Sequence, residues 1–337
     1  MKVLVTGGLG FIGSHTVVEL QNEGFEVVII DDLSNSSESV LQGIEKITGK
    51  LPLFEKIDLR EKAAVQDFFK KHNDVTGVIH FAASKAVGES VENPLLYYEN
   101  NIGTLVYLLQ QLQQKPEASF IFSSSCTVYG QAEKMPITED APIQAAMSPY
   151  GNTKQIGEEI ITDTARVTNI SAILLRYFNP VGAHETTEIG ELPIGVPQNL
   201  VPFITQTGMG LRKELSVFGN DYPTPDGTAV RDYIHVVDLA KAHVIALKRL
   251  LDKKNLAKVE TFNLGTGKGS SVLEVINSFE KVSNTKLPYK VMPRREGDIT
   301  EAYANTDKAN DILGWKAQLT LDEAMASAWK WEQKVRS

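Results

Sequence analysis

The chain opens with a strand, a glycine-rich turn and a helix, and this order constrains its fold more than any other feature. Residues 2–6 (KVLVT) form an apolar run typical of a buried strand, and Gly7-Gly8-Leu9-Gly10-Phe11-Ile12-Gly13 follows. Such a turn brings the free N–H groups of a helix N-terminus close to a phosphate. The next apolar run, 26–31, ends on an acidic pair. We therefore predict a dinucleotide-binding β-α-β unit that uses Gly7, Gly10, Gly13, Asp31 and Asp32.

The acidic pair also selects between the two common nicotinamide dinucleotides. A carboxylate at Asp31 accepts hydrogen bonds from the adenosine ribose hydroxyls, whereas it repels a 2′-phosphate. Residues 31–40 contain no Arg or Lys that could offset this repulsion. The sequence therefore predicts NAD rather than NADP. A purely structural glycine turn is the alternative, and the strand, the helix and the acidic pair around the turn argue against it.

Strand-like and helix-like segments alternate over the first 180 residues. Further apolar runs lie at 51–57, 77–81, 119–123 and 170–177, and helical periodicity lies at 13–23, 94–114 and 149–166. Unbroken apolar runs such as VVII indicate strands that are buried on both faces, as in a parallel sheet. This order predicts an α/β fold in which residues 1–180 form a Rossmann domain, a doubly wound parallel sheet that binds NAD.

The composition changes after Pro180. Prolines, glycines and polar residues dominate as far as Asp226, and longer helical patterns return at 236–251, 272–282 and 321–335. We interpret residues 181–337 as mainly a smaller C-terminal α/β substrate domain, with some segments that return to the Rossmann domain. Its long glycine- and proline-rich loops are more typical of a binding site than of a linker.

A serine run and a Tyr-Lys pair form the candidate catalytic group. Ser123-Ser124-Ser125 ends the fifth predicted strand, and Tyr150 and Lys154 are four residues apart on one helix face. A free tyrosine has a pKa near ~10, but a nearby ammonium and a cationic nicotinamide ring both favour the phenolate and lower that pKa. Ser125 can hold the reacting oxygen. The three groups suit removal of a proton from an alcohol while a hydride leaves the same carbon.

Composition argues against several classes of function. The 337 residues carry 34 Lys+Arg against 42 Asp+Glu, and this net charge of -8 gives no sign of nucleic-acid binding. No apolar run approaches the ~20 residues of a membrane span, and the N-terminus lacks a signal-peptide pattern.

Cys126, the single cysteine, reads as a small hydrophobe and suits a reducing compartment, so we expect a cytoplasmic protein. The six histidines show no metal-ligand spacing, and we predict no metal.

Seven segments together resemble one enzyme family. They are VTGGLGFIGSH, VIHFAASKAVGES, FSSSCTVYG, SPYGNTK, LRYFNPVGAH, FGNDYPTPDGTAVRDYIHV and RREGD. Their order is similar to that of the extended short-chain dehydrogenase/reductase family over essentially the whole chain. Within this family the chain most resembles the enzymes that reversibly epimerise UDP-sugars at C4.

The resemblance implies a reaction and a set of residues. Tyr150, aided by Ser125 and Lys154, takes the proton of the sugar 4-hydroxyl while tightly bound NAD takes the hydride. The 4-keto sugar then turns about its phosphate linkage and receives the hydride on its opposite face. The resemblance places at NAD the residues Phe11, Ile12, Asp31, Asn35, Ser36, Asp58, Leu59, Phe81, Lys85, Asn100, Tyr150, Lys154 and Phe178. It places at the UDP-sugar the residues Ser125, Asn179, Asn199, Leu200, Ser216, Phe218, Arg231, Arg295 and Asp298.

Residue chemistry supports parts of this assignment. Arg231 and Arg295 can clamp a diphosphate, Asp298 can accept from ribose hydroxyls, and Phe218 offers an apolar wall to uracil. A solvated basic surface is the alternative for Arg294-Arg295. Two further segments follow strands at the cofactor edge, where position alone suggests contact with NAD. These are Asp58, which could instead cap a helix, and Phe81-Ala82-Ala83, whose small residues could instead serve close packing.

Two finer expectations follow from the resemblance. Ala302, four residues after the Asp of RREGD, lies where the family meets the C2 substituent of the sugar, and a small residue there implies that N-acetylated UDP-sugars are accepted too. The alternative is that Tyr303 closes this space. We also expect a homodimer through the helix 94–114, which the resemblance places beside the helix 149–166: part of an apolar stripe on 94–114 must cover the sheet, and the rest would pair with its two-fold copy. A fully intramolecular helix is the alternative. The stripe comprises Leu95, Leu96, Leu105, Leu108, Leu109 and Leu112.

Other reactions are possible on the same fold. A nucleotide-sugar 4,6-dehydratase typically carries an Asp-Glu pair directly after its catalytic Ser or Thr, whereas this chain has Cys126-Thr127. A sugar reductase or decarboxylase has less support in the PVGAH and RREGD segments. A non-catalytic NAD-binding scaffold would have no need of Ser125, Tyr150 and Lys154 together.

Overall fold

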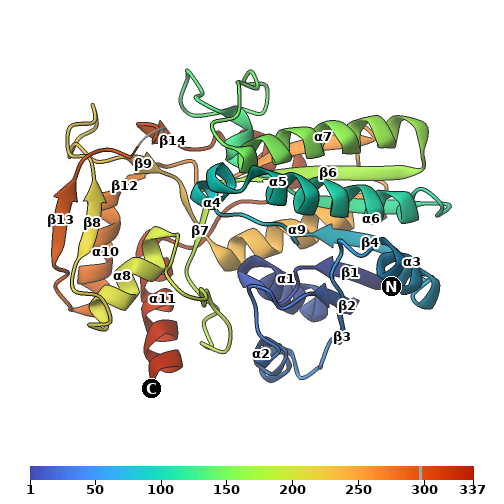
Figure 1. Ribbon diagram of the computed structural model, residues 1–337, viewed down its shortest axis with the longest axis horizontal. Helices are drawn as coiled ribbons and strands as arrows, with labels where there is room; N and C mark the ends of the chain where they lie inside the picture. The colour runs from blue at the N-terminus through green and yellow to red at the C-terminus, as the bar shows by residue number, and fades with distance from the viewer. Residues whose placement is uncertain (296–297) are drawn as a thin grey trace.

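A seven-stranded parallel sheet forms the centre of the molecule, whose computed structural model describes residues 1–295 and 298–337 (Figure 1). The strand order is β11-β6-β5-β4-β1-β2-β3, and the order reverses between β1 and β4 as in a doubly wound fold. The predicted Rossmann sheet is confirmed. Its strands are β1 (Lys2–Thr6), β2 (Glu26–Asp31), β3 (Leu53–Lys56), β4 (Val75–His80), β5 (Ala118–Ser123), β6 (Ile170–Tyr177) and β11 (Val259–Leu264).

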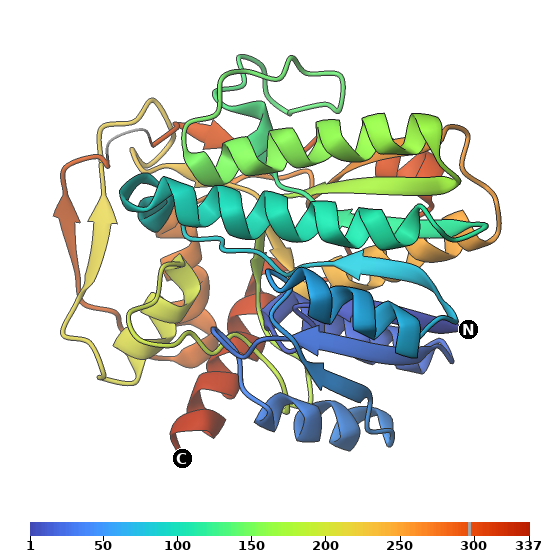
Figure 2. The ribbon, with the colours of Figure 1, turned by 45° about the vertical axis from the view of Figure 1, so that its right-hand side comes forward.

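Helices cover both faces of this sheet, as the two views in Figures 1 and 2 show. Successive strand residues point to opposite faces, so Val3 and Val5 enter one core and Leu4 enters the other. The first core is closed by α1 (Phe11–Asn22), α2 (Ser39–Thr48) and α9 (Val236–Leu251). The second core is closed by α3 (Lys62–Lys71), α6 (Thr104–Leu112) and α7 (Pro149–Val167).

Three elements of the sheet layer come from the second half of the chain, namely α9, β11 and the π-helix η3 (Ala309–Leu313), whose Ala309 and Leu313 lie in the first core. Helix α9 packs against α1, and β11 pairs in parallel with β6 along its whole length. The sequence analysis located α9 but missed β11, because the segment VETFNL is short and mixes polar with apolar residues. The chain therefore crosses between the sheet layer and the second lobe more than once.

The second lobe lies beyond the carboxyl ends of the strands (Figure 1). Ile204, Phe279 and Met325 are fully buried in its core. Helices α10 and α11 both begin with a capping box, Ser271 with Glu274 and Thr320 with Glu323, which explains why their starts were predictable. The lobe comprises β7 (Asn179–Val181), α8 (Leu200–Gly208), β8 (Leu215–Phe218), β9 (Val230–Arg231), β10 (Tyr233–His235), β12 (Ser270–Ser271), α10 (Val272–Ser283), β13 (Tyr289–Met292), β14 (Glu301–Ala302) and α11 (Leu321–Arg336).

The single helix expected over 94–114 is wrong. The segment is divided into α5 (Pro94–Tyr97), a π-helix η1 (Tyr98–Gly103) and α6, and a short α4 (Val87–Glu92) precedes it. A π turn inserts an extra residue into the helical repeat, and such turns are frequent at functional sites. Across the described ranges, no helix is both long enough and apolar enough to cross a bilayer.

Four buried histidines couple the stability of this fold to pH. Burial lowers the pKa of His15 and His80 to about 3, and that of His235 and His243 to about 4. An imidazole in an unfolded chain titrates near ~6.5. Below that pH the unfolded chain binds protons that the folded chain does not, so the free energy of unfolding decreases as the pH falls.

We expect this loss to reach about 1.4 kcal/mol per histidine and pH unit below pH 6. Urea unfolding at pH 7 and at pH 5 measures it, and unfolding should take up close to one proton for each of these residues. His243→Phe removes one titrating group from the core and should flatten the dependence. Equal unfolding free energies at the two pH values would contradict the prediction.

Candidate functional site

The glycine turn after β1 packs backbone against backbone. Gly7 has a φ of +67°, and a Cβ on Gly7 would lie 2.8 Å from the amide nitrogen of Ala82. A Cβ on Gly13 would lie 2.2 Å from the carbonyl oxygen of Gly7. Helix α1 begins at Phe11 with Gly10 as its N-cap, which offers no side chain to the first N–H groups. The turn thus fits a pyrophosphate, because glycine lets the ligand reach these N–H groups.

The acidic pair lies at the carboxyl end of β2, beside this turn. Asp31 is buried and accepts hydrogen bonds from the N–H groups of Leu9 (3.1 Å) and Leu33 (3.0 Å) and from the hydroxyl of Ser36 (2.7 Å). A carboxylate has about four acceptor positions, so Asp31 retains capacity for a ribose hydroxyl. Asp32 instead accepts from Ser34, at 2.9 Å from its N–H and 2.6 Å from its hydroxyl.

The predicted NAD residues after β3 and β4 differ in burial and in polar partners. Both carboxylate oxygens of Asp58 bind Arg60, with 2.6 Å between Oδ2 and Nη2, and this pairing lowers the pKa of Asp58. Helix α3 begins with Glu61 as its N-cap, so Asp58 does not cap it, and any adenine contact would share the carboxylate with Arg60. Leu59 is buried, Phe81 packs 4.7 Å from the ring of His243, and Lys85 is exposed.

The π-helix brings two consecutive asparagines to the loop after β4. Asn100 Nδ2 donates to the Ser84 hydroxyl at 2.8 Å. Asn101 accepts from the Ser84 N–H at 2.8 Å and donates to Thr153 Oγ1 at 3.0 Å, next to Lys154 on α7. The sequence analysis singled out Asn100 but missed Ser84 and Asn101. An Asn-Asn pair followed by Gly103 inside a helical pattern was the signal, because none of these residues favours a helix interior.

Local sequence signals place Ser125 and Tyr150 at the same edge of the sheet. Strand β5 ends at Ser123, and the Ser124 N–H donates to the Phe122 carbonyl at 2.9 Å, which turns the chain. Helix α7 begins with Ser148 as its N-cap and Pro149 in its first turn. Tyr150 therefore lies in the first turn of α7, where the Ser125 hydroxyl is close enough to act on the pKa of its phenol.

Lys154 is buried one turn further along α7. Its ammonium donates to the Ser123 carbonyl at 2.7 Å and lies 5.8 Å from the ring centroid of Tyr150. Burial lowers the pKa of Lys154 to about 8, and the negative charge of Glu158 opposes this shift. The lysine is thus held against the segment Ser123–Ser125, called the serine loop below, and lies close to the phenol of Tyr150.

The pKa of Tyr150 differs from the sequence-based expectation. Burial raises it above the ordinary value, Tyr177 raises it further, and the neighbouring Ser125 hydroxyl lowers it. The cost of removing a phenolate from water exceeds the help that the protein groups give. The expected lowering therefore requires a further positive charge beside the phenol, such as a cationic nicotinamide ring.

In the second lobe, two predicted substrate residues bind each other. Arg231 of β9 forms an ion pair with Asp298. The guanidinium of Arg295 lies 3.9 Å from the ring centroid of Phe218, so it covers one face of the proposed apolar wall. Arg294 pairs with Asp221 at 2.8 Å, as expected for a surface arginine. Glu296 and Gly297 of the RREGD segment lie outside the described residues.

The remaining substrate candidates lie on several elements. Asn179 begins β7, Leu200 begins α8 and Ser216 lies exposed on β8. Asn199 is the N-cap of α8 and donates to Glu191 Oε1 at 2.6 Å.

Ala302 is 3% exposed and pairs in register with Arg231. It shares a core cluster with Phe178 and Tyr129, against which Cys126 packs. The ring of Tyr303 lies against Gly269 instead, since a Cβ there would be 3.1 Å from it.

Asp232 is a buried polar residue that the sequence analysis missed. It accepts from the Thr266 N–H at 2.8 Å, the Thr266 hydroxyl at 2.7 Å and the Ala304 N–H at 3.2 Å. Asp232 follows β9, and its carboxylate thereby joins this strand to the end of β14 and to the loop after β11. The signal was an acidic residue beside Arg231 in the mainly apolar segment of residues 229–237.

Thiol and metal chemistry find little support at this site. Burial raises the pKa of the Cys126 thiol to about 11, so a reactive thiolate is disfavoured. Among residues 1–295 and 298–337, no group of three or more His, Cys, Asp or Glu side chains could hold a metal ion.

A doubly wound sheet with an open glycine turn and a Ser-Tyr-Lys group at its carboxyl edge defines a short-chain dehydrogenase/reductase. Residues 4–328 match a family model described as GDP-mannose 4,6 dehydratase. The chain is 50% identical over 333 residues to UDP-glucose 4-epimerase of Bacillus subtilis, covering 98% of this chain and 97% of that protein. It therefore belongs to the extended short-chain dehydrogenase/reductase family and, within it, to the UDP-glucose 4-epimerases.

Solved structures agree with this placement. The UDP-glucose 4-epimerase of Stenotrophomonas maltophila, crystallised with NAD and formylated UDP-arabinopyranose, has a TM-score of 0.95 and 46% identity, covering 100% of this chain and 99% of that one. A UDP-Glc/GlcNAc 4-epimerase of Campylobacter jejuni has a TM-score of 0.85 and 33% identity, covering 99% of each chain.

Proposed function

We propose that this chain reversibly interconverts UDP-glucose and UDP-galactose by epimerisation at C4, with tightly bound NAD. The observation that carries the proposal is the Ser125-Tyr150-Lys154 group, which lies at the same sheet edge as the open glycine turn. The relative from Stenotrophomonas maltophila, which binds NAD and a UDP-sugar analogue, supports the same pair of ligands. A cytoplasmic location is part of the proposal, because a single cysteine suits a reducing compartment, and fractionation of expressing cells would test it.

In this proposal the two parts of the chain bind different ligands. Residues 1–180 bind NAD, and residues 181–337 mainly bind the UDP-sugar, while α9 and β11 complete the sheet. The glycine turn, Asp31 and the loops after β3 and β4 hold the dinucleotide. Arg231 and Arg295 hold the diphosphate and Asp298 accepts from the ribose hydroxyls, for which Arg231 must exchange its present partner, Asp298, for phosphate oxygens.

The chain's own residues move the proton and hold the sugar. Bound NAD supplies the hydride acceptor and a positive charge close to the phenol. Tyr150 accepts the proton of the sugar 4-hydroxyl and later returns it, while Ser125 holds the reacting oxygen. The Lys154 ammonium stabilises the phenolate, which burial otherwise disfavours. The clamp on the diphosphate keeps the sugar in the site while its opposite face turns towards the cofactor.

Dehydration is disfavoured although the matching family model is described by such an enzyme. Nucleotide-sugar 4,6-dehydratases typically carry an Asp-Glu pair directly after the catalytic Ser or Thr, which serves as acid and base in the elimination. This chain has Cys126 there, with a pKa raised to about 11, and Thr127, whose buried hydroxyl has no hydrogen-bond partner within the described residues. Neither side chain can exchange a proton readily near neutral pH.

Tyr150→Phe tests the assigned base. The variant keeps the ring but loses the proton acceptor, so turnover of UDP-galactose without added cofactor should fall by about two orders of magnitude or more. Thermal unfolding should change little. Tyr107→Phe, on α6 and away from the site, serves as the control and should retain normal turnover. Near-normal epimerisation by Tyr150→Phe would show that another group removes the proton.

We further propose that the enzyme converts UDP-N-acetylglucosamine and UDP-N-acetylgalactosamine. Ala302 is small, lies beside Arg231 and faces the same cluster as Phe178. Tyr303 packs against Gly269, which disfavours the alternative that its ring fills this space. A relative from Campylobacter jejuni is a UDP-Glc/GlcNAc 4-epimerase, which supports a second pair of substrates on this fold.

Ala302→Tyr tests this specificity. A large side chain should press on the acetamido group, and overpacking of this kind costs about 1–3 kcal/mol. We expect the variant to lose conversion of the N-acetylated sugars and to keep the glucose–galactose reaction, both measured by product analysis. If the unmodified enzyme converts neither N-acetylated sugar, the proposal fails.

We also propose that the enzyme is a homodimer. Of the apolar stripe considered above, Leu105, Leu108, Leu109 and Leu112 are buried against the sheet, whereas Leu95 is 80% and Leu96 38% exposed. On the neighbouring α4, Val91 is 62% and Val87 49% exposed. These four residues form an apolar patch that a two-fold copy would bury.

Leu95→Glu should convert the dimer to a monomer, because it places a charge in the buried patch. Light scattering at micromolar concentration measures the mass. Val167→Glu is the matched control, since Val167 is the last residue of α7 and is 83% exposed. The mass of this variant should match that of the unmodified protein. A monomeric mass for the unmodified protein would contradict the proposal.

A further inference from the structure

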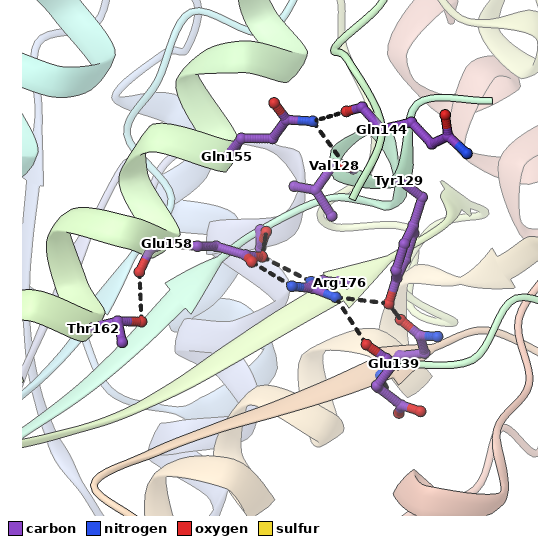
Figure 3. A network of polar contacts seen from close by, with 10 residues as sticks. Val128, Tyr129, Glu139, Gln144, Gln155, Glu158, Thr162 and Arg176 are labelled. Carbon is purple, nitrogen blue, oxygen red and sulfur yellow. Dashed lines mark hydrogen bonds and ion pairs between the residues drawn. The ribbon is translucent and has the colours of Figure 1, made fainter. Parts of the chain in front are cut away.

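A buried ion pair lies one helical turn behind the catalytic lysine. Glu158 of α7 and Arg176 of β6 point toward each other between the helix and the sheet (Figure 3). The contact is bidentate, with 2.9 Å from Arg176 Nε to Oε1 and 2.5 Å from Nη2 to Oε2. The two side chains are only 9% and 10% exposed.

The same carboxylate holds the serine loop. The Ser124 hydroxyl donates to Glu158 Oε1 at 2.5 Å. Ser124 is flanked by Ser123, whose carbonyl accepts from the Lys154 ammonium, and by Ser125, whose hydroxyl lies near the phenol of Tyr150. One carboxylate on α7 therefore sets the distance between the helix that carries the base and the loop that carries the serine.

Arg176 extends the network to the chain that follows Ser125. Its Nη1 donates to the Tyr129 hydroxyl at 3.0 Å, and Tyr129 donates to Asn263 Oδ1 at 2.7 Å. Gln155, one turn before Glu158, donates to the carbonyls of Val128 (2.9 Å) and Gln144 (2.7 Å), as Figure 3 shows. The segment after the catalytic serine is thus tied to α7 and to two strands of the sheet.

Glu158 also lies four residues after Lys154, on the same face of α7, and its negative charge raises the pKa of the lysine. The titratable groups that face this ammonium within the described chain are Glu158 and Tyr150 of α7 and His80 of β4. Burial lowers the pKa of His80 to about 3, so this imidazole is neutral at physiological pH. Only the carboxylate of Glu158 therefore opposes the tendency of burial to discharge the lysine.

We propose that Glu158 is a positioning residue that places Ser125 against Tyr150 and keeps Lys154 protonated. The proposal rests on the proposed function for its link to turnover. A merely structural pair would stabilise the fold without acting on the lysine, so the test must separate these two effects.

The chain contains a matched control pair. Arg249 of α9 and Glu260 of β11 form a second buried bidentate contact, at 2.7 Å and 3.0 Å, with side-chain exposures of 12% and 8%. This pair also joins a helix to the sheet. Neither Arg249 nor Glu260 is a proposed catalytic or binding residue, so loss of this ion pair should affect stability alone.

The experiment compares Glu158→Gln with Glu260→Gln. Both variants should lose thermal stability, because each leaves a buried arginine without its counter-charge. Only Glu158→Gln should lower kcat, by about tenfold to a hundredfold, with little change in KM. The titration midpoint of Lys154, followed by NMR of side-chain-labelled lysine in the protein without substrate, should fall by about one pH unit in Glu158→Gln alone. The basic limb of the pH profile should move in the same direction.

Ser124→Ala keeps the ion pair and covers the case in which Glu158→Gln fails to fold. It should lower kcat through the serine loop and leave the midpoint of Lys154 unchanged. An unchanged midpoint in Glu158→Gln, normal kcat in Ser124→Ala, or equal loss of kcat in Glu158→Gln and Glu260→Gln would overturn the proposal. Absence of epimerisation by the unmodified enzyme would contradict the proposed function alone, because the lysine midpoint is measured without turnover.

Discussion

The close approach of two backbone segments, at Gly7 and Ala82, is the constraint on which the cofactor edge depends. No side chain fits between them, so the loop after β4 lies directly against the turn after β1. The Phe81 N–H donates to the Thr6 carbonyl, and the Thr6 hydroxyl hydrogen-bonds to His80 at 2.7 Å. These contacts fix the ends of β1 and β4, which are the strands on either side of the reversal in strand order. The positions of the open N-terminus of α1 and of the neighbouring serine loop depend on this contact between the ends of β1 and β4.

Much of this architecture could be predicted because its signals are local. The glycine turn, the N-cap at Ser148 and the capping boxes of α10 and α11 are short patterns whose geometry depends on adjacent residues. Strand β11 could not be predicted, because its place in the sheet depends on pairing with β6, far away in sequence. The π-helix was missed because an apolar stripe outweighed the polar pair Asn100-Asn101.

The candidate site was predictable in composition but not in its internal pairing. Sequence alone indicated that Arg231 and Asp298 belong to one site, but not that they bind each other. It also expected the Lys154 ammonium and a nicotinamide ring to lower the pKa of Tyr150, without the opposing effect of burial. Burial changes that balance, since it raises the pKa of the phenol and lowers that of the ammonium. Such shifts depend on the depth of a group in the folded molecule, which a linear pattern does not encode.

The position of β11 has a consequence for synthesis of the chain. Until residue 264 has left the ribosome, β6 is the edge of the sheet, and the unpaired N–H and C=O groups of its outer side are open to other strands. Helix α9, which covers one face, also emerges late. The nascent Rossmann layer therefore remains incomplete for more than 80 residues after its first six strands have been made. Protection of this edge falls to the nascent chain itself or to chaperones that bind exposed strands.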